Sequence, residues 1–317
     1  MKRIILIGVS IMILLTYCTN IKRKNKANQI SEKEIYMFTS FHEPADEGLR
    51  FLYSYDGYNW DSLPGIFLNP EVGLQKIMRD PSIAMGPDST YHLVWTCSWK
   101  NDPGFGYSSS KDLINWTSQQ HIPIMVHEPT TVNVWAPEVF YDDEQNDFII
   151  IWASTIPYRF EKGIEPEDNN NRLYYTRTKD FKEFSTPEII YDPGYNSIDA
   201  TIVKKDKNDY VMVFKDNTRP NRYMEAAFSN TPIGPYINKT EPFTTHFTEG
   251  PSVVKVDDQW LIYYDAYETQ TYDALATTDF QTFTNINDQI SIPKNHKHGT
   301  IFKTTETILN NLKKIKK

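Results

Sequence analysis

One short phrase recurs along this chain about every fifty residues, and it limits the possible folds more than any other feature of the sequence. Each copy ends an apolar run, passes through an Asp or Asn turn and opens the next run with an aromatic residue. The copies are 53–60 (YSYDGYNW), 109–116 (SSKDLINW), 177–184 (RTKDFKEF), 277–283 (TTDFQTF) and the divergent 228–236 (FSNTPIGPY). A period of roughly 40–50 residues is typical of repeat architectures, in which each repeat is one supersecondary unit.

A second phrase, in which a polar residue leads into an apolar run, precedes each copy of the first. Its five copies are placed at Asp80, Glu138, Asp199, Glu249 and His298, about 49 to 61 residues apart. The first four copies are followed by strong β patterns at 91–96, 148–152, 210–214 and 260–264. Short runs rich in Val, Ile, Tyr, Phe and Trp, separated by turn residues, predict an all-β chain.

Five repeats of about four strands each predict a five-bladed β-propeller. The fifth copy contributes a strand at 300–304, after which too little sequence follows to complete a blade. Three N-terminal runs, at 35–40, 49–55 and 59–63, belong to no other repeat. We therefore expect the last blade to combine one C-terminal strand with three N-terminal strands, which closes the ring. A β-sandwich is the alternative, but it does not explain two phrases that recur in a fixed order.

Charge is distributed unevenly along the chain. Positions 1–26 and 313–317 hold ten of the 33 basic residues and no acidic residue, which leaves 23 basic against 41 acidic residues between them. Such an acidic body repels polyanions, so we expect no nucleic-acid partner and favour a neutral substrate or a bound cation. A hydrophobic fraction of 39% that includes 14% aromatic residues excludes a disordered chain. We expect a monomer.

The N-terminus has the pattern of a secretory signal. Lys2 and Arg3 precede an apolar run at 4–15 that is too short to span a bilayer, and Cys18 follows in a sequence similar to a bacterial lipobox. We predict a lipoprotein signal over 1–17, lipidation of Cys18 and a flexible tether over 18–33; an ordinary signal peptide is the alternative. The expected location is lipid-anchored, in the periplasm or at the cell surface. The propeller is expected at 34–305, followed by a basic tail at 306–317.

Cys97 is the one cysteine left after Cys18, so no internal disulfide is expected. It lies in an apolar run at 91–97 and is predicted to be a small buried hydrophobic residue. The fold must then be held together by its core.

The second phrase has a chemical consequence. The first strand of each propeller blade lines the central channel, so matched positions converge there, and in this chain they bring four carboxyl groups and one imidazole together. Carboxylates are rarely buried without partners, which argues against a packing role for the whole set. Hydrolysis of a glycosidic bond usually requires two flanking carboxyl groups, and a third can raise the pKa of the one that acts as acid.

The sequence resembles glycoside hydrolase family 43, whose members are five-bladed propellers. The matching motifs, in the order of the family, are 79–83 (RDPSI), 135–138 (WAPE), 197–200 (SIDA), 249–251 (EGP) and 298–300 (HGT). The resemblance implies Asp80 as the general base that activates water, Glu249 as the general acid and Asp199 as the residue that tunes the pKa of the acid. It also implies inversion at the anomeric carbon and a calcium ion in the channel, contacted by His298 through water. No organic cofactor is expected.

Four further residues are candidates for contact with the sugar. Trp99, Trp135 and Phe105 lie near strand–loop junctions and could stack on a sugar ring, with core packing as the alternative for each. Glu138 is the fourth candidate; it need not be catalytic, and a structural role beside the metal or the channel wall is favoured.

The sequence departs from the family pattern at two places. Lys297 precedes the final His-Gly where relatives tend to have Arg, and Gln270-Thr271 stand near Tyr272, where relatives have an arginine that binds substrate hydroxyls. We expect an exo-acting α-L-arabinofuranosidase on plant-type polysaccharide or oligosaccharide, with β-xylosidase and exo-β-galactosidase as alternatives. A retaining fructan hydrolase is disfavoured, because Gly250 follows Glu249 where those enzymes have Cys. The alternative of another class is a lipoprotein propeller that binds sugars without hydrolysing them.

Overall fold

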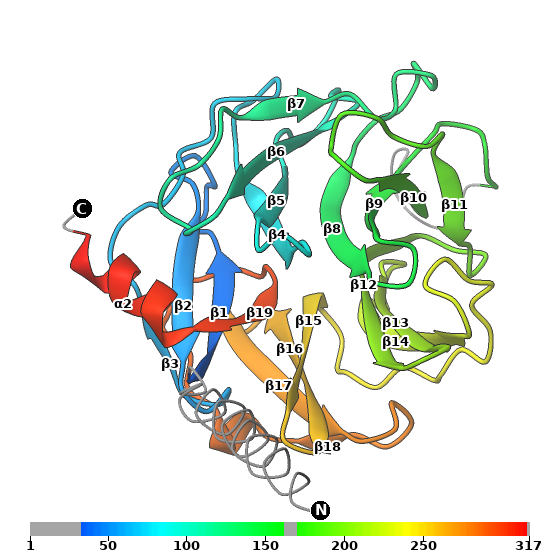
Figure 1. Cartoon of the computed structure of the whole chain (residues 1–317). Coiled ribbons are helices and arrows are strands. Elements are labelled where there is room, and N and C mark those ends of the chain that lie inside the picture. The colour runs from blue at the N-terminus through cyan, green and yellow to red at the C-terminus, as the bar shows by residue number, and fades with distance from the viewer. Residues whose placement is uncertain (1–32, 162–169, 316–317) are drawn as a thin grey trace, which may run out of the picture. The chain divides into compact units, whose positions relative to one another are not determined.

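A computed structural model describes residues 33–161 and 170–315 of the chain. Five antiparallel sheets are arranged around a central axis (Figure 1), which confirms the five-bladed β-propeller that the repeats predict. The inner strand of each blade is β19, β4, β8, β12 or β15.

The first blade joins the C-terminal strand to three N-terminal strands, as the repeats require. It comprises β19 (Ile301–Thr305), β1 (Glu34–Ser40), β2 (Arg50–Ser54) and β3 (Trp60–Ser62). The ring is closed by antiparallel pairing of β1 with β19, in which Met37 lies opposite Phe302. The predicted closure of the last blade is therefore confirmed.

The other four blades follow in chain order. The second comprises β4 (Arg79–Met85), β5 (Tyr91–Thr96), β6 (Phe105–Ser110) and β7 (Gln120–Ile122). The third comprises β8 (Trp135–Asp142), β9 (Asp147–Ser154), β10 (Arg172–Thr178) and β11 (Glu188–Tyr191). The fourth comprises β12 (Ser197–Asp206), β13 (Asp209–Asp216) and β14 (Tyr223–Ser229). The fifth comprises β15 (Thr248–Val256), β16 (Gln259–Ala266), β17 (Thr271–Thr277) and β18 (Thr284–Asn285), followed by a 3-10 turn, η1 (Asn287–Gln289).

The recurring Asp phrase forms the turn between the last two strands of a blade. The carboxylate of Asp56 accepts hydrogen bonds from the backbone N–H groups two and three residues later, at 2.8 Å each. Asp112, Asp180 and Asp279 make the same pair of contacts in their own blades. Because an Asp side chain can replace backbone partners in this way, the phrase marks a turn rather than a binding site.

The divergent phrase belongs to the fourth blade, which has three strands. A single bridge between Phe228 and Ile237 stands where a fourth strand would pair. Past the bridge, Asn238 has a left-handed φ of 54°, and the N–H groups of Ala226 and Met224 donate to the hydroxyls of Thr240 and Thr244 instead of backbone carbonyls, so no regular ladder follows.

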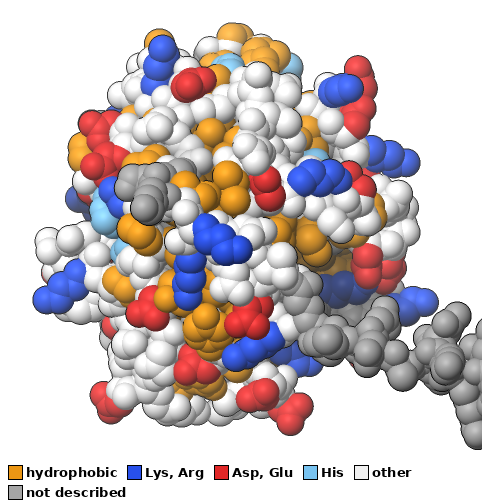
Figure 2. All heavy atoms as spheres, turned by 60° about the vertical axis from the view of Figure 1, so that its left-hand side comes forward, with side chains coloured by type: hydrophobic (Ala, Val, Ile, Leu, Met, Phe, Trp, Pro, Cys, Tyr) orange, Lys and Arg blue, Asp and Glu red, His pale blue; other side chains and the backbone are white. Residues whose placement is uncertain are grey.

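The apolar cores lie between neighbouring blades. One cluster, for example, packs Phe105 and Val94 of the second blade against Trp152 of the third. A C-terminal helix, α2 (Glu306–Lys314), docks on the outside by burying Leu309 and Leu312 against the first blade and its neighbour. Among the described residues, no helix has the length and apolar character needed to cross a bilayer. Acidic and basic side chains are interspersed over the face seen in Figure 2.

Candidate active site

Four inner strands carry a β-bulge at the same place near their start. The regular pairing with the second strand breaks between Arg79 and Ser82, Trp135 and Glu138, Ile198 and Thr201, and Glu249 and Ser252. A bulge inserts one extra residue and changes the direction in which the following side chains point. In β4, β8 and β15 a proline lies inside the break, where a missing N–H is tolerated.

Each bulge holds one residue in the left-handed backbone region. The φ angles are 51° at Asp80, 45° at Ala136, 52° at Asp199 and 61° at Gly250. This conformation costs free energy for residues other than glycine and is common at functional sites. Glycine is required in β15 for a second reason, because a Cβ atom on Gly250 would lie 2.0 Å from Cγ of His298.

The bulges correct the alignment of the five polar positions that the sequence predicted to be matched. Asp80 and Asp199 occupy the left-handed position, whereas Glu249 lies one residue before it and Glu138 two residues after it. The prediction was wrong because it matched the polar residues with one another, whereas the equivalent bulges match Glu249 with Arg79, Trp135 and Ile198, and Glu138 with Ser82, Thr201 and Ser252. Glu138 consequently lines a small inner cavity of about 30 Å³, and Glu249 lines a larger pocket.

The larger pocket has a volume of about 250 Å³ and brings together the three predicted catalytic carboxyl groups, those of Asp80, Asp199 and Glu249. Its remaining walls are two tryptophans and a set of basic or polar side chains: Trp99, Trp135, Arg79, Lys215, Asn217, Arg219, Arg222 and His298. The pocket thus combines carboxyl groups able to exchange protons with aromatic and hydrogen-bonding surface, as a sugar site requires.

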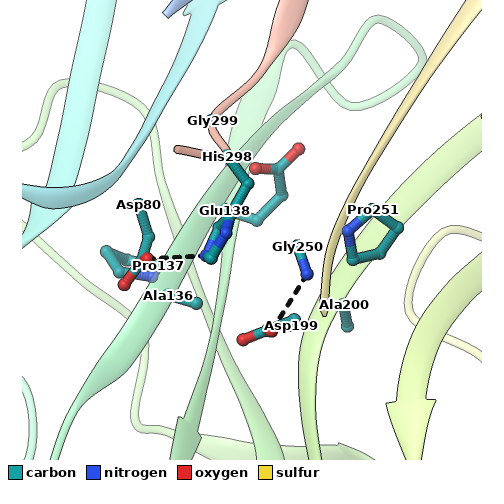
Figure 3. Close-up of a pocket in the computed structure, with 10 residues that line it drawn as sticks. All are labelled: Asp80, Ala136, Pro137, Glu138, Asp199, Ala200, Gly250, Pro251, His298 and Gly299. Atoms are coloured by element: carbon teal, nitrogen blue, oxygen red, sulfur yellow. Dashed lines mark hydrogen bonds and ion pairs between the residues drawn. The ribbon is translucent and has the colours of Figure 1, made fainter. Parts of the chain in front are cut away.

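Asp80 is held at both carboxylate oxygens. Nε2 of His298 lies 2.8 Å from Oδ1, as the close-up in Figure 3 shows, and Thr96 donates its hydroxyl to Oδ2 at 2.7 Å. Burial raises the pKa of Asp80, but the hydrogen bond and charge of His298 outweigh burial and bring this pKa below its usual value. Asp80 is therefore ionised near neutral pH, as a general base must be.

Lys215 controls the electrostatics of the other two carboxyl groups. This lysine is 1% exposed, and its Nζ lies 3.0 Å from Oε2 of Glu249. Burial raises the pKa of Glu249, but the charges of Lys215, His298 and Arg79 together with the Lys215 hydrogen bond outweigh burial, and the pKa falls below its ordinary value. Burial raises the pKa of Asp199 to about 6, although Lys215 opposes this shift. In the free site, a proton is therefore held more tightly by Asp199 than by Glu249.

Comparison with known proteins identifies the family. Residues 32–309 match a family described as a probable glycosyl hydrolase domain related to family 43. This chain belongs to that family. The resemblance drawn from the five motifs is confirmed.

Individual relatives agree with this assignment. An α-L-arabinofuranosidase of Bifidobacterium longum is 29% identical over 105 residues, which is 30% of this chain but 10% of that protein. The fold is similar to that of a Cellvibrio cellulosa α-L-arabinanase solved with arabinohexaose, with a TM-score of 0.56, 14% identity and coverage of 82% of this chain and 95% of that one. It is also similar to a Bacteroides thetaiotaomicron endo-1,4-β-xylanase, with a TM-score of 0.57, 15% identity and coverage of 86% and 94%.

The aromatic candidates of this glycosyl hydrolase differ in position. Trp99 is 44% exposed, and its ring lies 4.9 Å from that of Trp135, whose Nε1 donates to the Trp99 carbonyl at 2.7 Å. The guanidinium of Arg79 covers Trp99 at 4.7 Å, so both tryptophans form one wall of the pocket. Phe105 is fully buried between two blades, so the stacking role considered for it is wrong and the packing alternative holds.

Glu138 has a structural position in this glycosyl hydrolase. It accepts hydrogen bonds from the hydroxyl groups of Thr201 at 3.0 Å and Thr300 at 3.1 Å, which come from two other blades. Burial raises its pKa to about 7. Glu138 lines the inner cavity and not the larger pocket, a position that favours the channel-wall alternative over contact with the substrate.

His298 offers no free nitrogen as a direct ligand to the calcium ion that the family resemblance implies, although it lies with Glu249 and Asp265 in a group with metal-ligand spacing. Its Nε2 faces Asp80, and its Nδ1 lies 3.2 Å from Oδ2 of Asp265. Burial lowers the pKa of His298, but the two carboxylates raise it well above the usual value, so the ring is an imidazolium without a free lone pair. Asp265 also pairs with Lys297 at 3.2 Å, and the nearby Glu249 pairs with Lys215. The potential ligand atoms of these groups thus already face cations.

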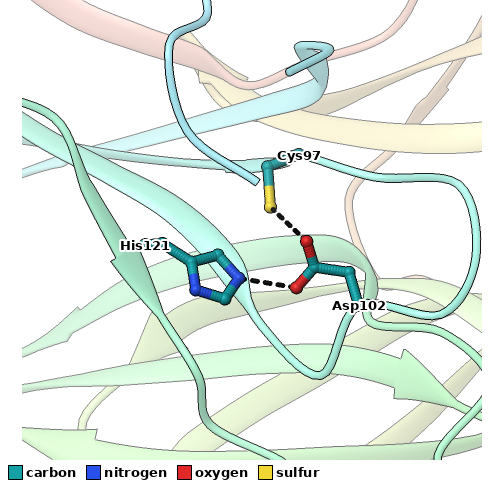
Figure 4. A group of neighbouring side chains, drawn as sticks. All are labelled: Cys97, Asp102 and His121. Atoms are coloured by element: carbon teal, nitrogen blue, oxygen red, sulfur yellow. Dashed lines mark hydrogen bonds and ion pairs between the residues drawn. The ribbon is translucent and has the colours of Figure 1, made fainter. Parts of the chain in front are cut away.

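A second group of potential metal ligands, Cys97, Asp102 and His121, lies outside both cavities (Figure 4). The Asp102 carboxylate accepts from Ser98 Oγ at 2.9 Å, from the Leu74 N–H at 2.8 Å and contacts His121 Nε2 at 2.5 Å. Burial raises the pKa of the Cys97 thiol to about 12, so the thiol is uncharged. These contacts secure the loop that carries Trp99, and Cys97 is the buried hydrophobic residue that the sequence predicts.

Sequence reasoning missed Lys215 and Asp265. Each directly follows the apolar run of its second strand, and neither belongs to a recurring motif. Both stand near the ends of strands, β13 and β16, that pair with an inner strand, and Asp265 lies opposite Glu249. A charged residue at the end of an otherwise apolar run was the available signal. Arg219 and Arg222 come from the loop between β13 and β14 and supply arginine to the pocket, although the region near Tyr272 lacks it.

Proposed function

We propose that this protein is an inverting, exo-acting glycoside hydrolase with α-L-arabinofuranosides as substrates. The observation that carries the proposal is the convergence of Asp80, Asp199 and Glu249 on one pocket of about 250 Å³ walled by two tryptophans. A pocket of this size is suited to one terminal sugar, which supports exo action. The α-L-arabinofuranosidase of Bifidobacterium longum supports the choice of sugar through its local identity of 29%.

In the proposed reaction, Asp80 takes a proton from water while the water oxygen attacks the anomeric carbon. The bond from that carbon to the leaving oxygen breaks, its electron pair stays on the oxygen, and Glu249 donates a proton there. Water and leaving group occupy opposite faces of the sugar, so the configuration inverts.

Asp199 acts by its charge. Its Oδ2 accepts a hydrogen bond from the Gly250 N–H at 3.1 Å, a contact that stabilises the carboxylate form. In the free site the proton is held by Asp199. Glu249 can donate a proton to the leaving group only if that proton moves to Glu249 when the sugar binds. A sugar that separates Lys215 from Glu249 would have this effect, because the pKa of Glu249 is lowered chiefly by Lys215.

Two alternatives follow from the same site. β-Xylosidase or exo-β-galactosidase activity requires the same carboxyl groups and differs only in the sugar contacts. A propeller that only binds sugar has no use for three carboxyl groups around one ring, two of them with shifted pKa values of opposite direction.

Anchoring to a membrane is a separate proposal. The predicted signal over 1–17, Cys18 and most of the tether at 18–33 lie outside the described residues. The composition of these segments supports a lipid anchor that holds the propeller in the periplasm or at the cell surface.

A panel of nitrophenyl glycosides tests the proposed function. We expect hydrolysis of the α-L-arabinofuranoside to exceed that of the β-xyloside and β-galactoside, with NMR of the first product showing the inverted anomer. Asp80→Asn should lower kcat by roughly 10²- to 10⁴-fold with an unchanged circular-dichroism spectrum, and Glu249→Gln should do so for poor leaving groups. Oligosaccharide binding without turnover of any glycoside would favour the binding propeller instead, and a retained anomer would make Asp80 a nucleophile.

A further inference from the structure

His298 is clamped between two carboxylates that come from different strands. Its Nε2 contacts Oδ1 of Asp80 on β4 at 2.8 Å, and its Nδ1 contacts Oδ2 of Asp265 on β16 at 3.2 Å. All three side chains are largely buried, with 7% of His298, 12% of Asp80 and 3% of Asp265 exposed. The second oxygen of Asp265 faces Nζ of Lys297 at 3.2 Å. A chain of alternating charges thus runs from the partly exposed Lys297 to the proposed base.

The backbone around the ring leaves it little freedom to move. The ring packs on the α-carbon of Gly250, where any Cβ would overlap it, and its edge meets the ring of Phe41 at 5.9 Å and 82°. The following Gly299 lies against the backbone of Thr39, where a Cβ would lie 2.2 Å from the carbonyl oxygen. These contacts restrict translation of the imidazole, but packing alone does not choose between its two flipped orientations.

A flip of the ring exchanges nitrogen and carbon at each position. With Asp265 in place, only one orientation puts an N–H opposite each carboxylate, so the flip breaks two charge-assisted hydrogen bonds at once. Without Asp265, a flip of the ring breaks only the contact with Asp80, so the ring is held less firmly and the firmest partner of Asp80 is Thr96 at Oδ2.

We propose that Asp265 is a positioning residue that acts through His298 to fix the carboxylate of Asp80 in the orientation in which it accepts a proton from water. The inference rests on the proposed function for the role of Asp80. Lys297 balances the charge of Asp265 and completes the chain. The imidazolium anchors Asp80 as a cation that belongs to the chain itself.

A double-mutant cycle tests whether Asp265 acts through Asp80. Asp265→Asn should lower kcat by about 10- to 100-fold at unchanged KM, because a misplacement of about 1 Å can cost that much. In the Asp80→Asn background the same substitution should cost less than twofold, since the group that it positions is already lost. Asp273→Asn, which changes an aspartate on the neighbouring strand β17, is the matched control and should leave kcat unchanged. Equal losses in both backgrounds would show a general structural role and overturn the proposal.

Two further measurements keep the proposal testable where Asp265→Asn folds poorly or turnover is absent. Lys297→Met changes a partly exposed side chain and should lower kcat by a few fold at unchanged KM; an unaltered kcat would remove Lys297 from the chain of charges. Crystal structures of Asp265→Asn and Lys297→Met report on positioning without any turnover. We expect the contact between Nε2 of His298 and Asp80 to be lost or shared between two conformers in the Asn variant. An unmoved Asp80 there would overturn the inference even if the enzyme hydrolyses arabinosides, whereas a displaced Asp80 would support it even if the substrate proves to be another sugar.

Discussion

Lys215→Met should move the alkaline limb of the pH–rate profile to higher pH. Lys215 is a nearly fully buried cation, and it lowers the pKa of both Glu249 and Asp199. The two carboxyl groups titrate together, so the direction does not depend on which of them holds the proton. Removing the cation makes the proton harder to lose, and the acid form persists to higher pH.

The size of this effect follows from the geometry. Coulomb's law with an effective dielectric constant of about 20 gives about 5 kcal/mol for unit charges 3.0 Å apart, the distance from Nζ to Oε2. One pKa unit corresponds to about 1.4 kcal/mol, so full loss of the attraction would exceed three units. Glu249 is 24% exposed, and water entering the space of the lysine would screen much of this change. We expect the limb to move up by about two pH units.

The assay is kcat/KM for a nitrophenyl arabinofuranoside between about pH 4 and 10, with thermal unfolding to confirm the fold. Lys239→Met is the matched control, because Lys239 also pairs with a buried carboxylate, that of Glu225, but does not line the larger pocket. Its profile should coincide with that of the wild type. An alkaline limb that stays in place or moves down in Lys215→Met would refute the assignment of Lys215 as the group that sets the acidity of the site.

Three other substitutions have defined outcomes. Asp199→Asn removes a negative charge near Glu249, so the alkaline limb of the pH–rate profile should move to lower pH, and turnover of nitrophenyl substrates should fall less than turnover of natural glycosides. Equal losses for both kinds of substrate with an unmoved limb would leave Asp199 a positioning role at most. Gly250→Ala places a methyl group against the ring of His298 at a φ of 61°, so the free energy of unfolding measured by calorimetry should fall by about 1–3 kcal/mol and turnover should fall as well. A variant as active and as stable as the wild type would contradict the close packing of His298 on Gly250. Cys18→Ser should yield an active protein that no longer sediments with membranes, and persistent sedimentation would point to a contact other than the lipid.

The propeller could be predicted from the sequence because its signals are local. In the turn at Asp56 and in its counterparts, the Asp carboxylate binds the backbone N–H groups of the residues two and three positions later, so the turn depends only on local sequence. These turns recur with the blades, so counting them counts the blades. Closure of the ring followed from leftover strands at both ends, and β1 and β19 pair as expected.

The site was only partly predictable because its details depend on single-residue register and on contacts between strands. Asp80, Asp199 and Glu249 could be named from their motifs, but the register of the inner strands, which places Glu249 one position before the level of Asp80 and Asp199, could not be read from them. Proline inside an apolar run, as at Pro81 and Pro251, was the sign of the bulges. Lys215 approaches Glu249 through tertiary packing alone, a contact that no local pattern encodes.

The repeated bulge also bears on how such a site arises by duplication of blades. Four of the five inner strands share the same left-handed backbone position facing the channel, whatever side chain it carries. In this chain Asp80 and Asp199 occupy that position with an acid, Gly250 with no side chain and Ala136 with a methyl group. A substitution at this one position can therefore change the chemical group that a blade presents to the channel, while the backbone conformation that presents it stays the same. The third and fifth blades, with Ala136 and Gly250, are the two in which this position carries no reactive group.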